Sequence, residues 1–269
     1  PFLSLLIDDC IKNGKDYHNG GARYNTSYIQ GVGMGSITDE LAALKYHVFD
    51  EKTISMKGML DALKSNFENY NEFRYLLLNK TPKYGNDDDY ADDITRQVFE
   101  IYFDAVDGKP TARGGFHRVN LLPTTCHVYF GSVIGAMPDG RKAGVPVSEG
   151  ISPVQGADRY GPTAVIKSAS KIDHIRTGGT LLNQKFTPAF LDSEKGIESV
   201  LHLIRSYFRL DGHHIQFNVV SAETLKKAKE KPEEYRDLIV RVAGYSDYFV
   251  DLTEELQNEI ILRTEHMES

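Results

Sequence analysis

Apolar residues recur at helical spacing, about one every 3.6 positions, over much of the chain. In the first such stretch, residues 2–13, Cys10 lies among the apolar positions and Gly14 follows as a C-cap. We therefore expect a helix with the Cys10 thiol buried. The same spacing predicts helices over residues 38–46, 55–66 (with Ser55 as N-cap), 70–78, 91–106, 192–210, 222–229 and 251–263.

Other stretches have the composition of strands. Residues 121–130 are rich in β-branched and aromatic side chains, which favours a strand. Because side chains alternate along a strand, Thr125, His127 and Tyr129 would share one face. Strands are also expected over residues 213–220 and 238–242.

Two loops contain residues typical of ligand sites. Residues 31–36 read Gly-x-Gly-x-Gly-Ser before a helix, but this is neither the dinucleotide fingerprint nor a Walker loop. Residues 85–89 hold three consecutive aspartates, without the alternating ligands of a calcium loop. A helix N-terminus fits the aspartates better, with Asn86 or Asp87 as the cap and acidic residues near the positive end of the helix dipole.

No metal site is predicted. Cys126, His127 and His117 could be ligands, but no second Cys-His cluster completes a set. His213 and His214 are neighbours in a predicted strand, so their side chains would point to opposite faces.

Residues 131–185 are rich in Gly, Pro and Ser and show little helical periodicity. So long a loop is uncommon in a compact domain unless it is functional.

Composition narrows the class of protein. The 269 residues carry a net charge of −7, which argues against an electrostatic nucleic-acid binder. No apolar run approaches the roughly 20 residues of a membrane helix, and the start lacks a signal peptide. With only two cysteines, a reducing cytoplasm is the expected location. The chain begins with Pro inside an amphipathic run, so we expect it to continue something longer.

The candidate chemistry centres on Gly244, which lies between a strand-like apolar run and an aromatic run. Glycine alone takes positive φ without penalty, so a tight turn explains it. Alternatively, loss of one Cα hydrogen would leave a radical that the adjacent amide nitrogen and carbonyl both delocalise. Packed aromatic residues around it would keep water and oxygen away. On the local pattern alone, both interpretations stay open.

The sequence Arg-Val-Ala-Gly-Tyr-Ser at 241–246, followed by Tyr248 and Phe249, resembles the signature of the glycyl radical enzymes, the pyruvate formate-lyase superfamily. Further segments resemble landmarks of this family in the family's order. They are Gly-Asn-Asp-Asp-Asp-Tyr at 85–90, Met-Pro-Asp-Gly-Arg-Lys-Ala at 137–143, Ser-Glu-Gly-Ile-Ser-Pro at 148–153 and Gly-Gly-Thr-Leu-Leu-Asn-Gln-Lys-Phe at 178–186.

The resemblance implies an α/β fold: part of a ten-stranded barrel over residues 1–146 and a glycine radical domain over 147–269. It implies that residues 31–36 are a packing loop, and that the loop 131–185 wraps the radical domain onto the barrel. It also implies that Gly244 stores the radical, with Arg241, Val242, Tyr245 and Ser246 as its neighbours. Thr125, His127 and Tyr129 become substrate-pocket candidates, because strands of this region line the family's barrel.

In such enzymes a radical S-adenosylmethionine activating enzyme installs the radical after translation, and no cofactor stays bound. The glycyl radical oxidises a cysteine to a thiyl, which takes hydrogen from a small-molecule substrate. That cysteine lies in a Gly-Cys-x-Glu context in the dehydratases, and neither Cys10 nor Cys126 matches it. The resemblance therefore implies that the thiol lies upstream, in a missing N-terminal part of the barrel, and that the full-length enzyme is a homodimer without nucleic-acid or membrane partners.

Residues 124–131 and 153–158 look nearest to the B12-independent glycerol and propane-1,2-diol dehydratases. The alternatives are an isethionate sulfite-lyase, a formate acetyltransferase-like enzyme, or a stand-alone radical-bearing subunit without its own catalysis. A further alternative lies outside this family: a globular protein in which Gly244 only makes a turn.

Overall fold

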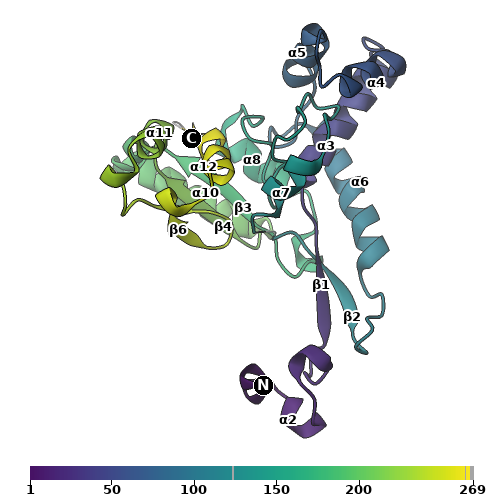
Figure 1. Ribbon diagram of the computed structural model, residues 1–269, viewed down its shortest axis with the longest axis vertical. Coiled ribbons are helices and arrows are strands. Elements are labelled where there is room, and N and C mark those ends of the chain that lie inside the picture. Colours follow the sequence, from purple (N-terminus) through teal and green to yellow (C-terminus); the bar gives the residue numbers. More distant parts are fainter. Residues whose placement is uncertain (123, 264, 267–269) are drawn as a thin grey trace.

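The computed structural model describes residues 1–122, 124–263 and 265–266. The molecule is elongated: the N-terminal arm lies at one end, helices α4 (Met56–Lys64) and α5 (Asn71–Asn79) at the other, and the C-terminal elements form a body at the side (Figure 1). The elements up to β2 are α1 Phe2–Leu6, α2 Cys10–Asn13, a 3-10 turn at Tyr17–Asn19, β1 Thr26–Gln30, α3 Met34–Ala43, a π-helical segment at Leu44–Asp50, α4 Met56–Lys64, α5 Asn71–Asn79, α6 Asp89–Val106 and β2 Phe116–Asn120.

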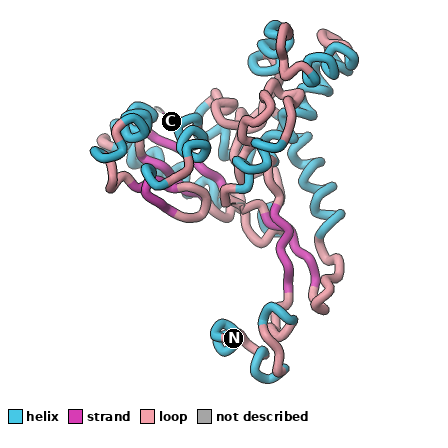
Figure 2. The backbone as a smooth tube through the Cα atoms, in the orientation of Figure 1, coloured by secondary structure: helices cyan, strands magenta, loops and turns pink. Residues whose placement is uncertain are grey.

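The second part of the chain contains most of the strands (Figure 2). Its elements are α7 Cys126–Val133, α8 Gly161–Ala169, a 3-10 turn at His174–Arg176, β3 Leu182–Phe186, α9 Pro188–Leu191, α10 Glu194–Arg209, β4 Ile215–Val219, α11 Ala222–Glu230, a 3-10 turn at Pro232–Glu234, β5 Ile239–Arg241, β6 Ser246–Tyr248, a 3-10 turn at Phe249–Asp251, α12 Glu254–Leu262 and β7 Glu265–His266.

The strands form separate small sheets. β1 and β2 pair in parallel along their full length, in register from Thr26 with Phe116 to Gln30 with Asn120. β3 lies between β4 and β7, parallel to both, while β5 and β6 form an antiparallel hairpin. All five residues of β3 are buried, as expected for a central strand in a parallel sheet.

Three apolar cores among the described residues hold these elements. The first lies between β3 and helices α6, α8 and α10, with Phe99, Phe186 and Tyr207 as large buried members. The second joins the β5–β6 hairpin to α11 and α12 through Val240, Val242, Leu225 and Ile260. The third lies under α4 and α5. The hairpin thus rests on its own core.

The predicted single helix over 2–13 is wrong, because the chain breaks into α1 and α2. Asp9 adopts φ +74° between them, and its carboxylate pairs with Arg23. Cys10 is buried and Gly14 caps α2 in the left-handed conformation, both as predicted. The apolar side chains of α1 are exposed (Phe2, Leu3, Leu5 and Leu6), so none of the apolar cores among the described residues holds a longer helix together.

The predicted strand over 121–130 is also wrong, because Cys126–Val133 form helix α7. In the helix, Val128 packs against the second core and the buried His127 side chain reaches Glu259 of α12. These tertiary contacts override the local preference for a strand.

The loop over 131–185 contains helix α8, which the sequence pattern missed. Pro162 occupies the first turn of α8, where its missing N–H costs nothing. The glycine-rich segment 31–36 is a packing loop: the Ser36 amide donates to the Ser148 hydroxyl and the Ser148 amide donates to the Ser36 hydroxyl. A side chain at Gly35 would lie 2.7 Å from the carbonyl oxygen of Ser152. Ser148 therefore occupies the helix N-terminus that a phosphate would need.

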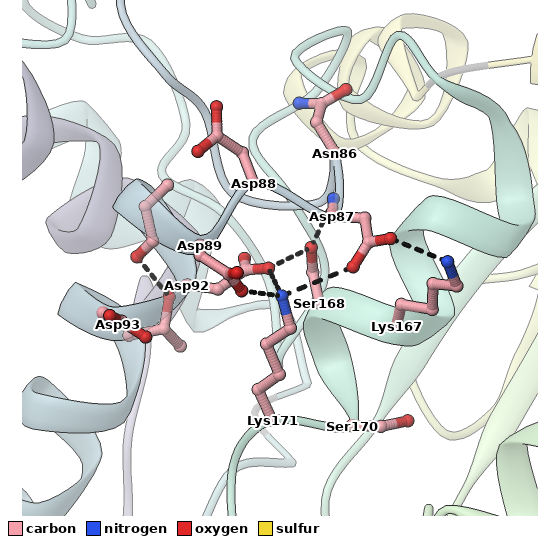
Figure 3. A network of polar contacts seen from close by, with 12 residues as sticks. Asn86, Asp87, Asp88, Asp89, Asp92, Asp93, Lys167, Ser168, Ser170 and Lys171 are labelled. Carbon is pink, nitrogen blue, oxygen red and sulfur yellow. Dashed lines mark hydrogen bonds and ion pairs between the residues drawn. The ribbon is translucent and has the colours of Figure 1, made fainter.

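The aspartate run does begin a helix, but the N-cap of α6 is Asp88 rather than Asn86 or Asp87. The run lies against α8 (Figure 3). Lys171 contacts Asp92 at 2.7 Å, Asp89 at 2.8 Å and Asp87 at 3.3 Å, and Lys167 contacts Asp87 at 2.8 Å. Lysines therefore neutralise these carboxylates and join α6 to α8.

Candidate functional site

Gly244 lies at the tip of the hairpin formed by β5 and β6. The two strands pair from Ile239 with Tyr248 to Arg241 with Ser246, and the Val242 amide donates to the Tyr245 carbonyl to close the loop at 2.9 Å. Gly244 is exposed in this chain, and the aromatic side chains of the hairpin do not cover it. The expectation that packed aromatic residues surround Gly244 therefore does not hold within the described residues.

The backbone at Gly244 has φ +81°, a conformation that residues with a Cβ rarely adopt. A Cβ placed there would meet no atom within 4 Å. Glycine is thus required by conformation and not by crowding. The turn interpretation explains that conformation, so the backbone alone does not separate it from the radical interpretation.

The loop residues before Gly244 anchor the hairpin. Val242 and Ala243 are almost fully buried, and Phe249 on the other side of the hairpin is fully buried in the second core. An exposed glycine is therefore held between two anchored flanks. This arrangement presents the Gly244 Cα at a fixed place on the surface.

Two side-chain amides of β4 contact the hairpin. The Asn218 side chain donates to the Arg241 carbonyl and accepts from the Arg241 amide, both at 2.8 Å. The Gln216 carboxamide oxygen accepts from the Gly244 amide at 3.2 Å and from the Arg241 guanidinium at 3.0 Å. Arg241 also donates to the Ser246 hydroxyl at 3.1 Å.

An ion pair lies behind the hairpin. Arg263 holds Glu259 in a two-pronged contact, with its Nη2 2.8 Å from the carboxylate, and donates to the Arg241 carbonyl at 3.3 Å. Burial alone would raise the pKa of Glu259, but the charge of Arg263 and the nearby His127 lower it overall. Burial raises the pKa of Glu149, which faces the same arginine. A small cavity of about 30 Å³ lies among these polar groups, room for roughly one water.

The three pocket candidates do not come together. Because 126–133 is a helix, residues four apart share a face, and Thr125 and Tyr129 line an open depression of about 500 Å³. Tyr245, next to Gly244, lines the same depression. His127 points the other way, fully buried, with its Nε2 3.5 Å from Glu259. The expected common face of the three residues is therefore wrong.

Sequence reasoning missed Gln216, Asn218, Glu259 and Arg263. A usable signal existed for the first two, because polar residues two apart in a predicted strand share a face. The sequence pattern does not say what that face meets. In the described ranges, no group of three or more histidine, cysteine or acidic side chains is placed to hold a metal ion.

Two family models match the chain. The pyruvate formate lyase-like model covers residues 1–131, and the glycine radical model covers residues 147–250, which include Gly244. This chain belongs to the glycyl radical enzymes. Its resemblance to that family, stated above from the motifs, is confirmed.

Similar proteins include trans-4-hydroxy-L-proline dehydratase of Clostridioides difficile, 59% identical over 98% of this chain and 34% of the relative. Isethionate sulfite-lyase of Bilophila wadsworthia is 42% identical over 99% of this chain and 33% of the relative. The chain thus spans about a third of the length of the relatives it matches.

Solved structures of relatives confirm the α/β fold of a glycyl radical enzyme. The hydroxyproline dehydratase of Clostridioides difficile with its substrate superposes with a TM-score of 0.95 at 58% identity, over 98% of this chain and 34% of that chain. The glycerol-bound B12-independent glycerol dehydratase of Clostridium butyricum superposes with a TM-score of 0.94 at 47% identity, over 100% of this chain and 34% of that chain. The described strands form three small sheets, and this chain covers about a third of those solved chains. No helix in the described residues is long and apolar enough to cross a membrane.

Proposed function

We propose that this chain is the C-terminal part of a glycyl radical dehydratase in which Gly244 stores the radical. The observation that carries the proposal is that the matched glycine radical segment places its Arg-Val-Ala-Gly-Tyr motif on an anchored hairpin tip. Loss of one Cα hydrogen at Gly244 leaves a radical stabilised by the amide nitrogen on one side and the carbonyl on the other. Arg241, Val242, Tyr245 and Ser246 hold that backbone in place.

The stored radical acts by hydrogen-atom transfer. A cysteine S–H bond breaks, the Gly244 Cα–H bond forms, and the unpaired electron moves to sulfur. The thiyl then takes a hydrogen atom from a substrate carbon. A neighbouring hydroxyl leaves as water with a proton released by the amine or hydroxyl on the radical carbon, and the product radical takes the hydrogen atom back from the cysteine. Cys10 is buried within the N-terminal arm, and neither Cys10 nor Cys126 lies in a Gly-Cys-x-Glu context, so the reacting thiol belongs to the upstream part of the polypeptide.

The upstream part would also complete the site. Gly244 is exposed here, and a barrel closed around it would keep water and oxygen from a carbon radical. On this proposal, residues 1–146 contribute to the barrel and residues 147–269 form the glycine radical domain. The partners are a radical S-adenosylmethionine activating enzyme and a second copy of the full-length chain, in the cytoplasm.

For the substrate, the proposal is a small hydroxylated molecule that loses water. Identity is 59% to the hydroxyproline dehydratase and 47% to the glycerol dehydratase, which favours trans-4-hydroxy-L-proline over the diol expected from residues 124–131 and 153–158. A diol remains the second candidate, because the glycerol enzyme superposes almost equally well. Incubation of the activated full-length enzyme with each compound separates them: the larger kcat/KM identifies the substrate, and turnover of isethionate alone would exclude both.

The radical itself is tested by electron paramagnetic resonance with a matched glycine control. Gly144 has φ +82°, is exposed and would seat a Cβ without contact, as Gly244 would. Alanine at either position adds about 1–2 kcal/mol of the same backbone strain. After anaerobic activation, the parent protein and Gly144→Ala should give a doublet from the one remaining Cα hydrogen, and Gly244→Ala should give none. An equal doublet from Gly244→Ala would refute the assignment.

A further inference from the structure

The hairpin that carries Gly244 is attached to the central sheet by side chains. Within the described residues, β4 pairs with β3 and β5 pairs with β6, and no backbone ladder joins β4 to β5. Asn218 and Gln216 replace that ladder: one engages the Arg241 backbone and the other the Gly244 amide. They lie two apart on β4, so both point to the same face.

Gln216 is itself held in one orientation. It is 5% exposed, and its Nε2 donates to the side-chain oxygen of Asn183, its register partner on β3. The backbone N–H of Asn183 donates to the Ser152 hydroxyl at 2.9 Å, and that hydroxyl donates to the Glu149 carboxylate at 2.5 Å. With its nitrogen committed, Gln216 can turn only its carboxamide oxygen toward the hairpin.

That oxygen reaches the backbone atom nearest the proposed radical centre. It accepts the Gly244 N–H at 3.2 Å, and the same oxygen accepts from the Arg241 guanidinium at 3.0 Å. A radical at the Gly244 Cα shares its unpaired electron with that amide nitrogen. The direction of the N–H bond therefore sets how the amide plane lies relative to the radical orbital.

We propose that Gln216 is a positioning residue for Gly244: its buried carboxamide oxygen fixes the Gly244 N–H and so orients the peptide plane on which the radical is delocalised. This inference rests on the proposed function. Asn218 differs from Gln216 in role, because it holds the hairpin at Arg241 and does not touch Gly244. The two residues are equally buried, which makes Asn218 a matched control for loosening of the hairpin.

Three variants of the full-length protein separate positioning from simple attachment. Gln216→Leu removes the acceptor. Gln216→Glu keeps an acceptor oxygen for the Gly244 N–H and places a negative charge beside Arg241. The Asn183 side chain, whose oxygen now accepts from the Gln216 Nε2, can turn its Nδ2 toward the new carboxylate. Asn218→Leu loosens the hairpin on the same face and leaves the Gly244 contact in place.

The measurement is the coupling of exchangeable hydrogen to the glycyl radical, by electron–nuclear double resonance in H₂O and D₂O after anaerobic activation, together with radical lifetime. We expect the parent protein, Gln216→Glu and Asn218→Leu to share one N–H coupling. Gln216→Leu should show a changed coupling and a lifetime shorter by about five-fold, the size expected for loss of one ordinary hydrogen bond.

An unchanged coupling and lifetime in Gln216→Leu would overturn the inference. So would an equal change in Asn218→Leu, because the effect would then come from loosening of the hairpin alone. If Gln216→Leu does not fold, a coupling in Gln216→Glu that differs from the parent's would overturn it. Absence of any radical in the activated parent protein would overturn the proposed function instead.

Discussion

Lys171 is the residue whose replacement should most weaken the contact between α6 and α8. Its ammonium group faces three carboxylates, of which Asp92 is completely buried (Figure 3). In Lys171→Met, the Asp92 carboxylate keeps only the Ser168 hydroxyl, because its Oδ1 has no hydrogen-bond partner among the described residues. Removing one partner of a buried ion pair lowers the free energy of unfolding by about 3–5 kcal/mol. Because Lys171 is 24% exposed, we expect a loss near 3 kcal/mol.

Hydrogen exchange of the full-length protein, followed by mass spectrometry, reads this local stability directly. A loss of about 3 kcal/mol speeds exchange of the amides in α6 and α8 by roughly 100-fold. Lys167 is the control, since it is 56% exposed and, among the residues that the structure describes, forms an ion pair with Asp87 alone. Loss of such a pair costs at most about 1 kcal/mol, so Lys167→Met should speed exchange by less than about five-fold.

The effect should also depend on pH. Burial raises the pKa of Asp92, although Lys171 opposes the shift, and loss of the lysine raises it further. A carboxyl group with a raised pKa takes up a proton on folding, so the defect of Lys171→Met should shrink as pH falls. Adding Asp92→Asn should remove most of the defect. Equal exchange in the two lysine variants, or a defect that grows on acidification, would refute the reasoning.

Three further predictions concern other parts of the chain. Burial raises the pKa of Asp39 to about 7, despite the nearby Lys83. The contribution of Asp39 to the stability of the α3 region is therefore fully present below about pH 4 and is lost as pH rises through about 7. Asp39→Asn should flatten this pH dependence in hydrogen exchange, and an unchanged slope would count against it. Gly85→Ala should destabilise the 85–90 segment in the same assay, because its Cβ would lie 2.3 Å from Pro153, whereas Gly108→Ala, also at positive φ but free of contacts, should cost far less. The isolated chain should aggregate, because β1 and β2 form a two-stranded sheet with open edges and α1 exposes its leucines; a cooperative monomeric melt would contradict this.

Helices with a clear apolar face could be predicted from the sequence. Ser55 accepts from the Gly58 amide as the predicted N-cap of α4, and α10 and α11 lie where the periodicity placed them. These elements form where local preference and tertiary packing agree. Helix α7 shows the opposite case, since His127 and Val128 find partners on α12 and in the second core that no local pattern contains.

The candidate site also contains residues that the local sequence predicts and residues that depend on tertiary contacts. Gly244 could be singled out from its flanking motif, because its proposed role resides in the backbone and its neighbours in sequence. Gln216 could not, because its link to Gly244 spans 28 residues and depends on how the hairpin lies against β4. The face on which Gln216 and Asn218 lie is readable from alternation, but the segment opposite that face is not.

The central claim is that Gly244 holds the radical. The position of the radical can be found from the place at which oxygen cleaves the backbone. An activated glycyl radical protein exposed to air should break its backbone at the radical residue, and mass spectrometry locates the break. We predict a new C-terminal fragment that begins with the oxidised remnant of Gly244, in the parent protein and in Gly144→Ala, and none in Gly244→Ala. A break at a different residue, or the same fragment from Gly244→Ala, would contradict the account.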